Sequence, residues 1–149
     1  MTEPGTKGSY ILLAEDETTN QYVFRAILES GNYEVTIVEN GQLVLEVARK
    51  RRPDIILLDM MMPVMDGYKT AAELIKDDSY DGVPILALTA QAMKGDAEKT
   101  LQAGCDDYMS KPIRRQELLD KVSTWLSRDA TDWMEERRRK RSQPMTDAA

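Results

Sequence analysis

Five short runs with strand character alternate with longer segments in which apolar residues recur at helical spacing. This alternation constrains the fold more than any other feature, because a repeated strand–helix order predicts a parallel sheet covered by helices. The runs are residues 10–14, 34–38, 55–58, 85–88 and, as the weakest, 107–109. We predict helices at residues 18 or 19 to 30, 42–51, 94–103, from 66 or 67 onward, and from 116 onward.

Capping and breaking residues mark several ends of the predicted helices. Thr18 or Thr19 can cap the first helix, and Gly31 is a natural stop for it. Pro53 ends the second helix and Gly104 closes the fourth. Because tryptophan and methionine continue at helical spacing after residue 127, we expect the fifth helix to extend past that point.

The two runs at residues 55–58 and 85–88 are apolar throughout, which is typical of strands covered on both faces. Right-handed crossovers then favour an α/β sandwich, a doubly wound five-stranded parallel sheet with helices on both faces. In such folds the functional site lies at the carboxyl ends of the strands, where the strand order reverses. Functional side chains should therefore follow the strands.

The side-chain inventory excludes several kinds of chemistry. The 149-residue chain has no histidine, and Cys105 is its only cysteine, so histidine catalysis and an internal disulfide are excluded and zinc is disfavoured. The net charge of −6 argues against nucleic acid as the main ligand. No apolar run approaches the ~18 residues that span a bilayer. Without a signal peptide, the single cysteine predicts a cytoplasmic protein in which Cys105 only packs.

Polar side chains do follow the strands. Glu15 and Asp16 come directly after the first run, Asp59 after the third, Thr89 after the fourth and Lys111 after the fifth. Each alone has an ordinary role, such as a turn former, a helix cap or a solvated charge. Together, three carboxylates need a cation, and carboxylate oxygens suit Mg²⁺ or Mn²⁺. With the lysine and the hydroxyl, such a site can hold a phosphoryl group while one carboxylate acts as the nucleophile.

Four sequence blocks resemble the signatures of two-component response regulator receiver domains, in that family's order and spacing. They are residues 11–17 (ILLAEDE), 57–67 (LLDMMMPVMDG), 87–90 (ALTA) and 108–112 (YMSKP). The resemblance covers residues 9–127 and extends both to single-domain chemotaxis-type regulators and to receivers of hybrid histidine kinases. It implies a flavodoxin-like (βα)5 fold and phosphorelay signalling.

The resemblance also implies the roles of the site residues. Asp59 would accept the phosphoryl group, and the domain would catalyse only its own phosphorylation and dephosphorylation. Asp16, Asp59 and the backbone carbonyl of Met61 would bind Mg²⁺ (or Mn²⁺), with Glu15 helping through a water molecule. Glu15 replaces the aspartate of many family members, and its longer side chain still reaches a metal-bound water.

Further residues would bind the phosphoryl group and report its arrival. Lys111 would pair with it, and Thr89 and Tyr108 would form the switch pair. Met61 and Gln91 flank the path of water attack, and because Met61 can exclude a water that Gln91 can orient, the lifetime of the phosphorylated state stays open.

Three residues are expected to shape the loops around the site. Pro63 and Gly67 shape the loop after the phosphoacceptor, with Gly67 supplying conformational freedom. The bond from Lys111 to Pro112 can be cis.

The expected partners are a sensor histidine kinase or a histidine phosphotransfer protein as donor, and a downstream protein as effector. In this family the effector usually binds the face of the fourth helix, fifth strand and fifth helix, here residues 94–103, 106–109 and 116–126. Whether the protein forms a dimer on phosphorylation is left open by the sequence. Membrane contact is not expected.

The expected organisation is a flexible segment at residues 1–8, the receiver at 9–127 and a helical extension with a basic tail at 128–149. Only 22 residues follow residue 127, too few for a DNA-binding output domain. We therefore expect a stand-alone receiver or a piece of a hybrid kinase. The basic run at residues 137–141 is expected to be a solvated helix end or disordered, with docking or nucleic-acid contact as the alternative.

Two other functions of this topology fit the residues less well. An aspartyl-phosphate phosphatase or phosphotransferase would place a second aspartate two residues after the nucleophile, where this chain has Met61. A flavin-binding module would need a phosphate-cradling loop after the first strand, but Glu15, Asp16 and Glu17 would repel a phosphate there.

Overall fold

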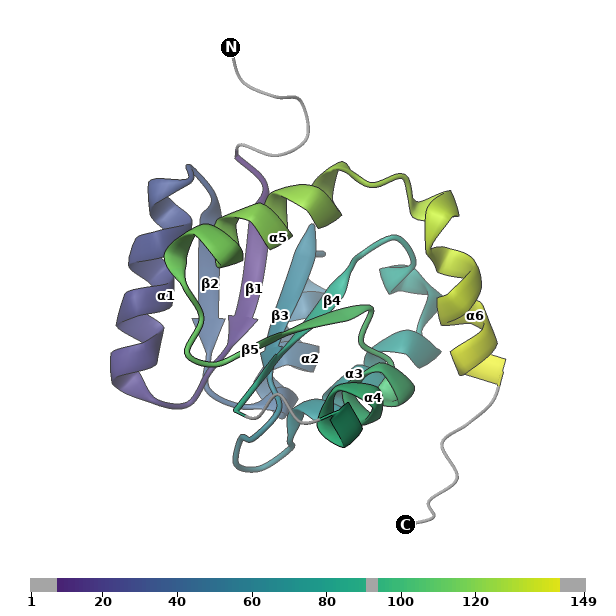
Figure 1. Ribbon diagram of the computed structural model, residues 1–149. Helices are drawn as coiled ribbons and strands as arrows, with labels where there is room; N and C mark the ends of the chain where they lie inside the picture. Colours follow the sequence, from purple (N-terminus) through teal and green to yellow (C-terminus); the bar gives the residue numbers. More distant parts are fainter. Residues whose placement is uncertain (1–7, 91–93, 143–149) are drawn as a thin grey trace.

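The computed structural model describes residues 8–90 and 94–142, which form a five-stranded sheet with helices on both faces (Figure 1). The strands are β1 (Tyr10–Ala14), β2 (Glu34–Val38), β3 (Ile55–Asp59), β4 (Ile85–Thr89) and β5 (Asp107–Ser110). The α-helices are α1 (Thr18–Ser30), α2 (Gly41–Lys50), α3 (Gly67–Lys76), α4 (Lys94–Ala103), α5 (Arg115–Ser127) and α6 (Met134–Ser142). Two 3₁₀ turns are η1 (Asp78–Tyr80) and η2 (Ala130–Asp132). All five predicted strands are present.

The sheet has the order β2-β1-β3-β4-β5, and every neighbouring pair is parallel. The chain runs outward from β1 to β2, then crosses back to β3 and continues to β5. The order therefore reverses between β1 and β3, whose carboxyl ends lie side by side. This confirms the predicted doubly wound fold and places the crevice next to Asp59, the last residue of β3.

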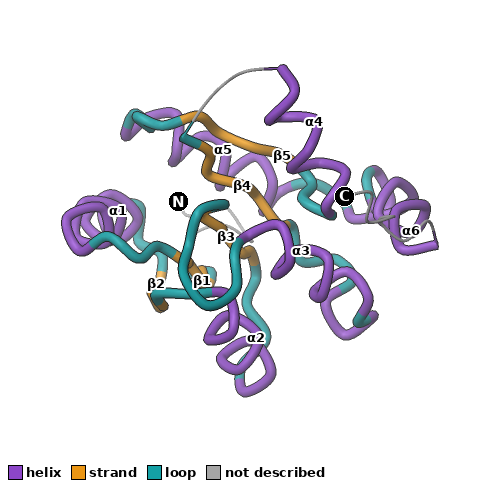
Figure 2. Tube along the Cα trace, turned by 90° about the horizontal axis from the view of Figure 1, so that it is seen from below, coloured by secondary structure: helices purple, strands orange, loops and turns teal. Residues whose placement is uncertain are grey.

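Alternate residues of the central strands face two separate cores. In β1, Ile11 and Leu13 pack with α1 and α5, whereas Leu12 and Ala14 pack with α2 and α3. Figure 2 shows the same layers along the strands, with α1 and α5 on one side of the sheet and α2, α3 and α4 on the other. Since β1, β3 and β4 are buried along their whole length, the apolar runs that precede Asp59 in β3 and Thr89 in β4 are explained.

Two helix caps differ from the prediction or were not anticipated. The N-cap of α1 is Glu17, whose carboxylate accepts from the Asn20 N–H at 2.9 Å, rather than Thr18 or Thr19. Asn40 caps α2 in the same way, by accepting from the Leu43 N–H at 2.9 Å. In each case the side-chain oxygen satisfies a backbone donor that the first helical turn leaves unpaired.

The C-terminal region differs most from expectation. Helix α5 ends at Ser127 instead of continuing, and after η2 the separate helix α6 lies beside α3 (Figure 1). The expectation of a solvated basic helix end fits the exposed Arg138 and Arg139 but is wrong for Arg137, which is fully buried. Its guanidinium donates to the carbonyls of Tyr80 at 2.9 Å and Val83 at 2.7 Å, so hydrogen bonds compensate much of the burial, although Nε has no hydrogen-bond partner among the described residues.

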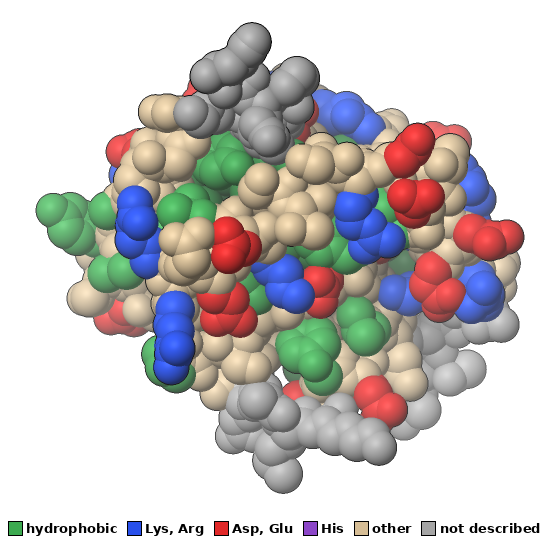
Figure 3. All heavy atoms as spheres, turned by 45° about the horizontal axis from the view of Figure 1, so that its top comes forward, with side chains coloured by type: hydrophobic (Ala, Val, Ile, Leu, Met, Phe, Trp, Pro, Cys, Tyr) green, Lys and Arg blue, Asp and Glu red, His purple; other side chains and the backbone are tan. Residues whose placement is uncertain are grey.

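The face drawn in Figure 3 has no large patch of charges of one sign. In the space-filling view, acidic and basic side chains are interspersed over the face that brings α5 forward (Figure 3). None of the helices in the described part of the chain is long and apolar enough to cross a bilayer.

Candidate functional site

Three carboxylates converge at the crevice between β1 and β3. Glu15 and Asp16 follow β1 directly, and Asp59 ends β3, so one oxygen of each lies within 4.8 Å of the others. Glu15 and Asp59 are 1% and 5% exposed, whereas Asp16 is exposed. The sequence-predicted acidic cluster is therefore formed, with one carboxylate open to solvent.

Lys111 supplies the positive charge of the cluster. Its Nζ lies 3.1 Å from Glu15 Oε1 and 3.1 Å from Asp59 Oδ2. The lysine is held in place because its backbone N–H donates to the Thr89 carbonyl at 2.7 Å. The peptide bond to Pro112 is cis. One ammonium thus bridges two buried carboxylates that come from different strands.

Burial and charge act against each other in this cluster. Burial raises the pKa of Glu15, while its hydrogen bond with Lys111 acts in the opposite direction. Burial alone would lower the pKa of Lys111, but its hydrogen bonds and charge interactions with Glu15 and Asp59 outweigh it and raise that pKa. The lysine is therefore firmly protonated at neutral pH.

Two residues that hold Glu15 were missed by the sequence analysis. Asn20 Nδ2 lies 3.4 Å from Glu15 Oε2, which also accepts from the Glu17 N–H at 3.1 Å. Gln21 Nε2 donates to the Glu15 backbone carbonyl at 2.6 Å. The available signal was a pair of amide side chains in the first turn of α1, beside the end of β1. Both oxygens of Glu15 are thereby engaged by the protein.

The loop after Asp59 is shaped by close packing. Met61 N–H donates to Asp59 Oδ1 at 3.0 Å, and Gly67 N–H donates to the Met60 carbonyl at 3.1 Å. A Cβ on Gly67 would lie 2.7 Å from the Asp59 carbonyl oxygen. Gly67 does not have a positive φ, whereas Val64 does, at 67°. Glycine is therefore needed at position 67 because a side chain would not fit, and not for the conformational freedom that the sequence suggested.

The predicted switch residues lie on β4 and β5, on the side of Asp59 opposite to Glu15 and Asp16. Thr89 is 4% exposed, and its Oγ1 lies 3.5 Å from the Met109 carbonyl. Tyr108 is half-buried and packs against the core between the sheet and α2–α3. A pocket of about 270 Å³ opens beside Thr89 and is lined by Met60, Met61, Tyr68, Thr89, Ala90 and Asp96. Gln91 lies outside the described residues.

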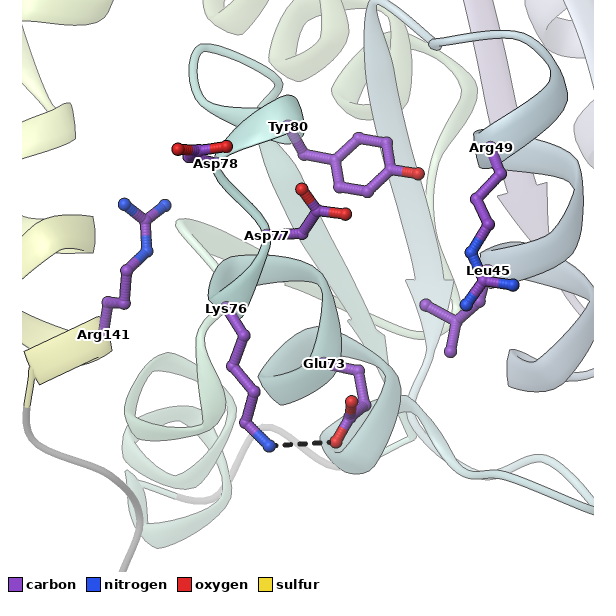
Figure 4. A pocket seen from close by; sticks show the side chains of 8 residues that line it. All are labelled: Leu45, Arg49, Glu73, Lys76, Asp77, Asp78, Tyr80 and Arg141. Carbon is purple, nitrogen blue, oxygen red and sulfur yellow. Dashed lines mark hydrogen bonds and ion pairs between the residues drawn. The ribbon is translucent and has the colours of Figure 1, made fainter.

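A larger pocket of about 510 Å³ lies away from this cluster, at the carboxyl ends of α2 and α3 (Figure 4). It is lined by Leu45, Arg49, Glu73, Lys76, Asp77, Asp78, Tyr80 and Arg141. Its charges are mixed, and Lys76 pairs with Glu73 at 3.1 Å. Because none of the predicted site residues lines it, its size does not make it the functional site.

The donor set of the crevice fits a hard divalent cation. All three clustered side chains offer carboxylate oxygens, and one lysine leaves part of their negative charge uncompensated. Oxygen ligands of this kind suit Mg²⁺ or Mn²⁺ and not a thiophilic metal.

Comparisons with known proteins agree with this geometry. The family model of the response regulator receiver domain matches residues 11–123. The polar-differentiation response regulator DivK of Brucella anthropi is 37% identical over 116 residues, covering 78% of this chain and 94% of that protein.

Two receiver domains of histidine kinases have similar structures. One, from Pseudomonas aeruginosa PAO1 with magnesium coordinated in its active site cleft, is 43% identical with a TM-score of 0.77, covering 81% of this chain and 99% of that one. The other, from Syntrophus aciditrophicus, is 32% identical with a TM-score of 0.76, covering 80% and 91%. With its fold, its site and these relatives, the chain belongs to the response regulator receiver domains of two-component signalling.

Proposed function

We propose that Asp59 is the phosphoacceptor of this receiver domain. The observation that carries the proposal is the ammonium of Lys111, which lies 3.1 Å from both Asp59 and Glu15 beside the exposed Asp16. A fixed cation next to a strand-end carboxylate can neutralise the oxygens of an incoming phosphoryl group. The Thr89 hydroxyl, at the end of the adjacent strand β4, is the further donor.

The reaction is a transfer of the phosphoryl group to an Asp59 carboxylate oxygen. With a phosphohistidine donor, the new P–O bond forms as the P–N bond breaks, and the imidazole leaves with the electron pair. The donor would be a sensor histidine kinase or a histidine phosphotransfer protein. Because the domain would catalyse only its own phosphorylation and dephosphorylation, it is not an enzyme that turns over a separate substrate.

The proposed metal ligands are Asp16, Asp59 and the backbone carbonyl of Met61. Glu15 would act through a water molecule, which fits the engagement of both its oxygens by protein donors. A bound Mg²⁺ would add positive charge next to the phosphoryl oxygens. Lys111 would then hold the phosphoryl group, and Asn20 would keep the Glu15 carboxylate in place.

Exposed apolar side chains lie on two segments next to the site, helix α1 and the β3–α3 loop. Tyr22 and Val23 on α1 are 76% and 46% exposed, and Met61 and Val64 in the β3–α3 loop are 68% and 80% exposed. Such side chains favour a protein donor over a small metabolite. The exposed Met61 would also shield the acyl phosphate from water on one side.

The proposed output is a protein-binding surface. Thr89 and Tyr108 would couple the phosphoryl group to the face of α4, β5 and α5, with residues 9–127 acting as the receiver unit.

Cys105 is fully buried and has no disulfide, which fits a reducing cytoplasm.

Phosphorylation of the intact protein tests the proposal. Incubation with acetyl phosphate and Mg²⁺ should add the mass of one phosphoryl group, and Asp59→Asn should abolish the adduct. Asp120→Asn, which changes an exposed carboxylate that pairs with Gln116 on α5, is the matched control and should be phosphorylated normally. An unmodified wild-type protein, or an equal adduct on Asp59→Asn, would contradict the assignment.

A further inference from the structure

Helix α6 is fastened to the domain by a buried arginine, in addition to the buried Met134 at its start. Arg137 is 0% exposed, and besides the carbonyls of Tyr80 and Val83 its guanidinium pairs with the carboxylate of Asp106. The same guanidinium lies 4.8 Å from the centre of the Trp133 ring. A charged group so completely enclosed stays favourable only while all these acceptors remain in place.

Two further side chains of α6 extend this attachment. Lys140 Nζ donates to the Cys105 carbonyl at 2.9 Å. Arg141 Nε donates to the Ile75 carbonyl at 2.5 Å, and its guanidinium pairs with Asp81. Figure 4 shows Arg141 extending from α6 beside the end of α3. We call Arg137, Lys140 and Arg141, together with these acceptors, the α6 clasp.

The clasp holds the connection between α4 and β5. Cys105 and Asp106 are two of the three residues that join these elements, and each accepts from an α6 side chain. Asp106 also accepts from the Ile85 N–H at 2.8 Å and donates its own N–H to the Ile85 carbonyl at 2.7 Å. Asp106 therefore ties the start of β4 to the connection before β5, and α6 holds that connection through Asp106 and Cys105.

These tied segments lead directly to the proposed switch. Tyr108 follows Asp106 by two residues, and Thr89 ends the strand that Ile85 begins. The clasp is complete in an arrangement in which Lys111 holds the Asp59 carboxylate and the Thr89 hydroxyl faces the Met109 carbonyl. A shift of α4 and β5 away from this arrangement would move Asp106 and Cys105 relative to α6.

We propose that α6 is an inhibitory clasp on the phosphorylation switch, which stabilises the arrangement described here against the phosphorylated one. The inference rests on the proposed function of Asp59. A helix that only covered the surface would stabilise both arrangements equally and would not change the equilibrium between them. The clasp differs because its buried charge is bonded to the very connection that precedes Tyr108.

Thermodynamic linkage requires that α6 and the Asp59 site affect each other by the same free energy, so the coupling can be measured at either one. Occupying the Asp59 site should loosen α6, and loosening α6 should tighten binding at Asp59. Beryllofluoride with Mg²⁺, which mimics a phosphoryl group on an aspartate, is the probe for both measurements.

The first measurement uses the unaltered protein. Hydrogen exchange of the α6 amides should become about fivefold faster or more when beryllofluoride and Mg²⁺ are added. Exchange that is unchanged or slower would overturn the proposal. If no beryllofluoride binds and acetyl phosphate adds no phosphoryl group, the proposed function fails and the inference falls with it.

The second measurement uses matched variants of the full chain. The double variant Arg137→Met with Lys140→Met should bind beryllofluoride about fivefold more tightly or better. Arg138→Met with Arg139→Met loses the same charge from the exposed side of α6 and should bind like the wild type. Equal affinity in all three proteins would overturn the proposal. If the first double variant does not fold, the exchange of the wild type decides alone.

Discussion

Gly67→Ala offers a direct test of how the site loop is built. A Cβ at this position would lie 2.6 Å from Met60 Cε, 2.7 Å from the Asp59 carbonyl oxygen and 2.8 Å from Met60 Cα. The methionine tip can rotate away, but the other two atoms belong to the backbone at the end of β3. The methyl group fits only if Asp59 or the start of α3 moves.

The expected cost follows from this overlap. Forcing an extra methyl group into a packed region costs about 1–3 kcal/mol, whereas alanine in a helix gains at most about 1 kcal/mol over glycine. Because the gain is smallest at the first position of a helix, the overlap should win. For a chain of this size, each kcal/mol lost lowers the melting temperature by about 2–4 °C. Beryllofluoride binding should weaken too, since Asp59 is displaced.

Gly95→Ala is the matched control, with the opposite expected sign. Gly95 is the second residue of α4 and a Cβ there meets nothing within 4 Å among the described residues, so the change should stabilise the protein by at most about 0.5 kcal/mol. Urea denaturation and thermal melting of both variants measure the two effects. If Gly67→Ala is as stable as the wild type and binds beryllofluoride equally well, the steric explanation is wrong.

Two further predictions concern single groups. Lys111→Met should slow phosphorylation by acetyl phosphate at least about 100-fold, because it removes the cation shared by Glu15 and Asp59. Intact mass followed over time measures the rate, and a rate within twofold of wild type would refute the role of Lys111. Burial raises the pKa of Cys105, so its stabilising contribution is complete below its ordinary pKa of about 8.5 and is lost as the pH rises above that value, where only the unfolded thiol ionises. The free energy of unfolding of wild type relative to Cys105→Ala should therefore fall by about 2 kcal/mol between pH 7 and pH 10. A pH-independent difference in urea denaturation would contradict this.

The sheet was predictable because its signal is local. Runs such as 55–58 are apolar throughout since they are covered on both faces, and the strand–helix alternation leaves few topologies. The ends of the elements were less predictable. Threonine is a preferred helix cap and glutamate is not, so the sequence favours Thr18, whereas the fold places the cap at Glu17.

The acidic site could be predicted because parallel strands bring their carboxyl ends to one edge. Asp59, Asp16 and Lys111 are far apart in sequence but follow strands of one sheet. The roles of these residues stay predictions until phosphorylation is measured. Asn20 was missed because its partner is the side chain of Glu15, which no periodicity identifies.

The helical extension was expected, but the way helix α6 attaches to the domain could not be foreseen, for a different physical reason. Its inward positions include Arg137, which in a sequence looks like any solvated arginine. Two of its acceptors are backbone carbonyls, 57 and 54 residues away along the chain. Backbone carbonyls leave no mark on a hydrophobicity pattern, so the pattern predicts exposure where the fold provides a buried site.

The attachment of α6 also has a consequence for folding kinetics. Its acceptors come from α3, η1 and the connections before β4 and β5, so they share one place only once β4 and β5 have paired. We therefore expect helix α6 to dock after the folding nucleus has formed, with φ values near zero for its contacts. Contacts that form after the transition state slow unfolding without speeding folding. Helix α6 accordingly lengthens the lifetime of the folded domain and leaves the speed of its formation to the sheet.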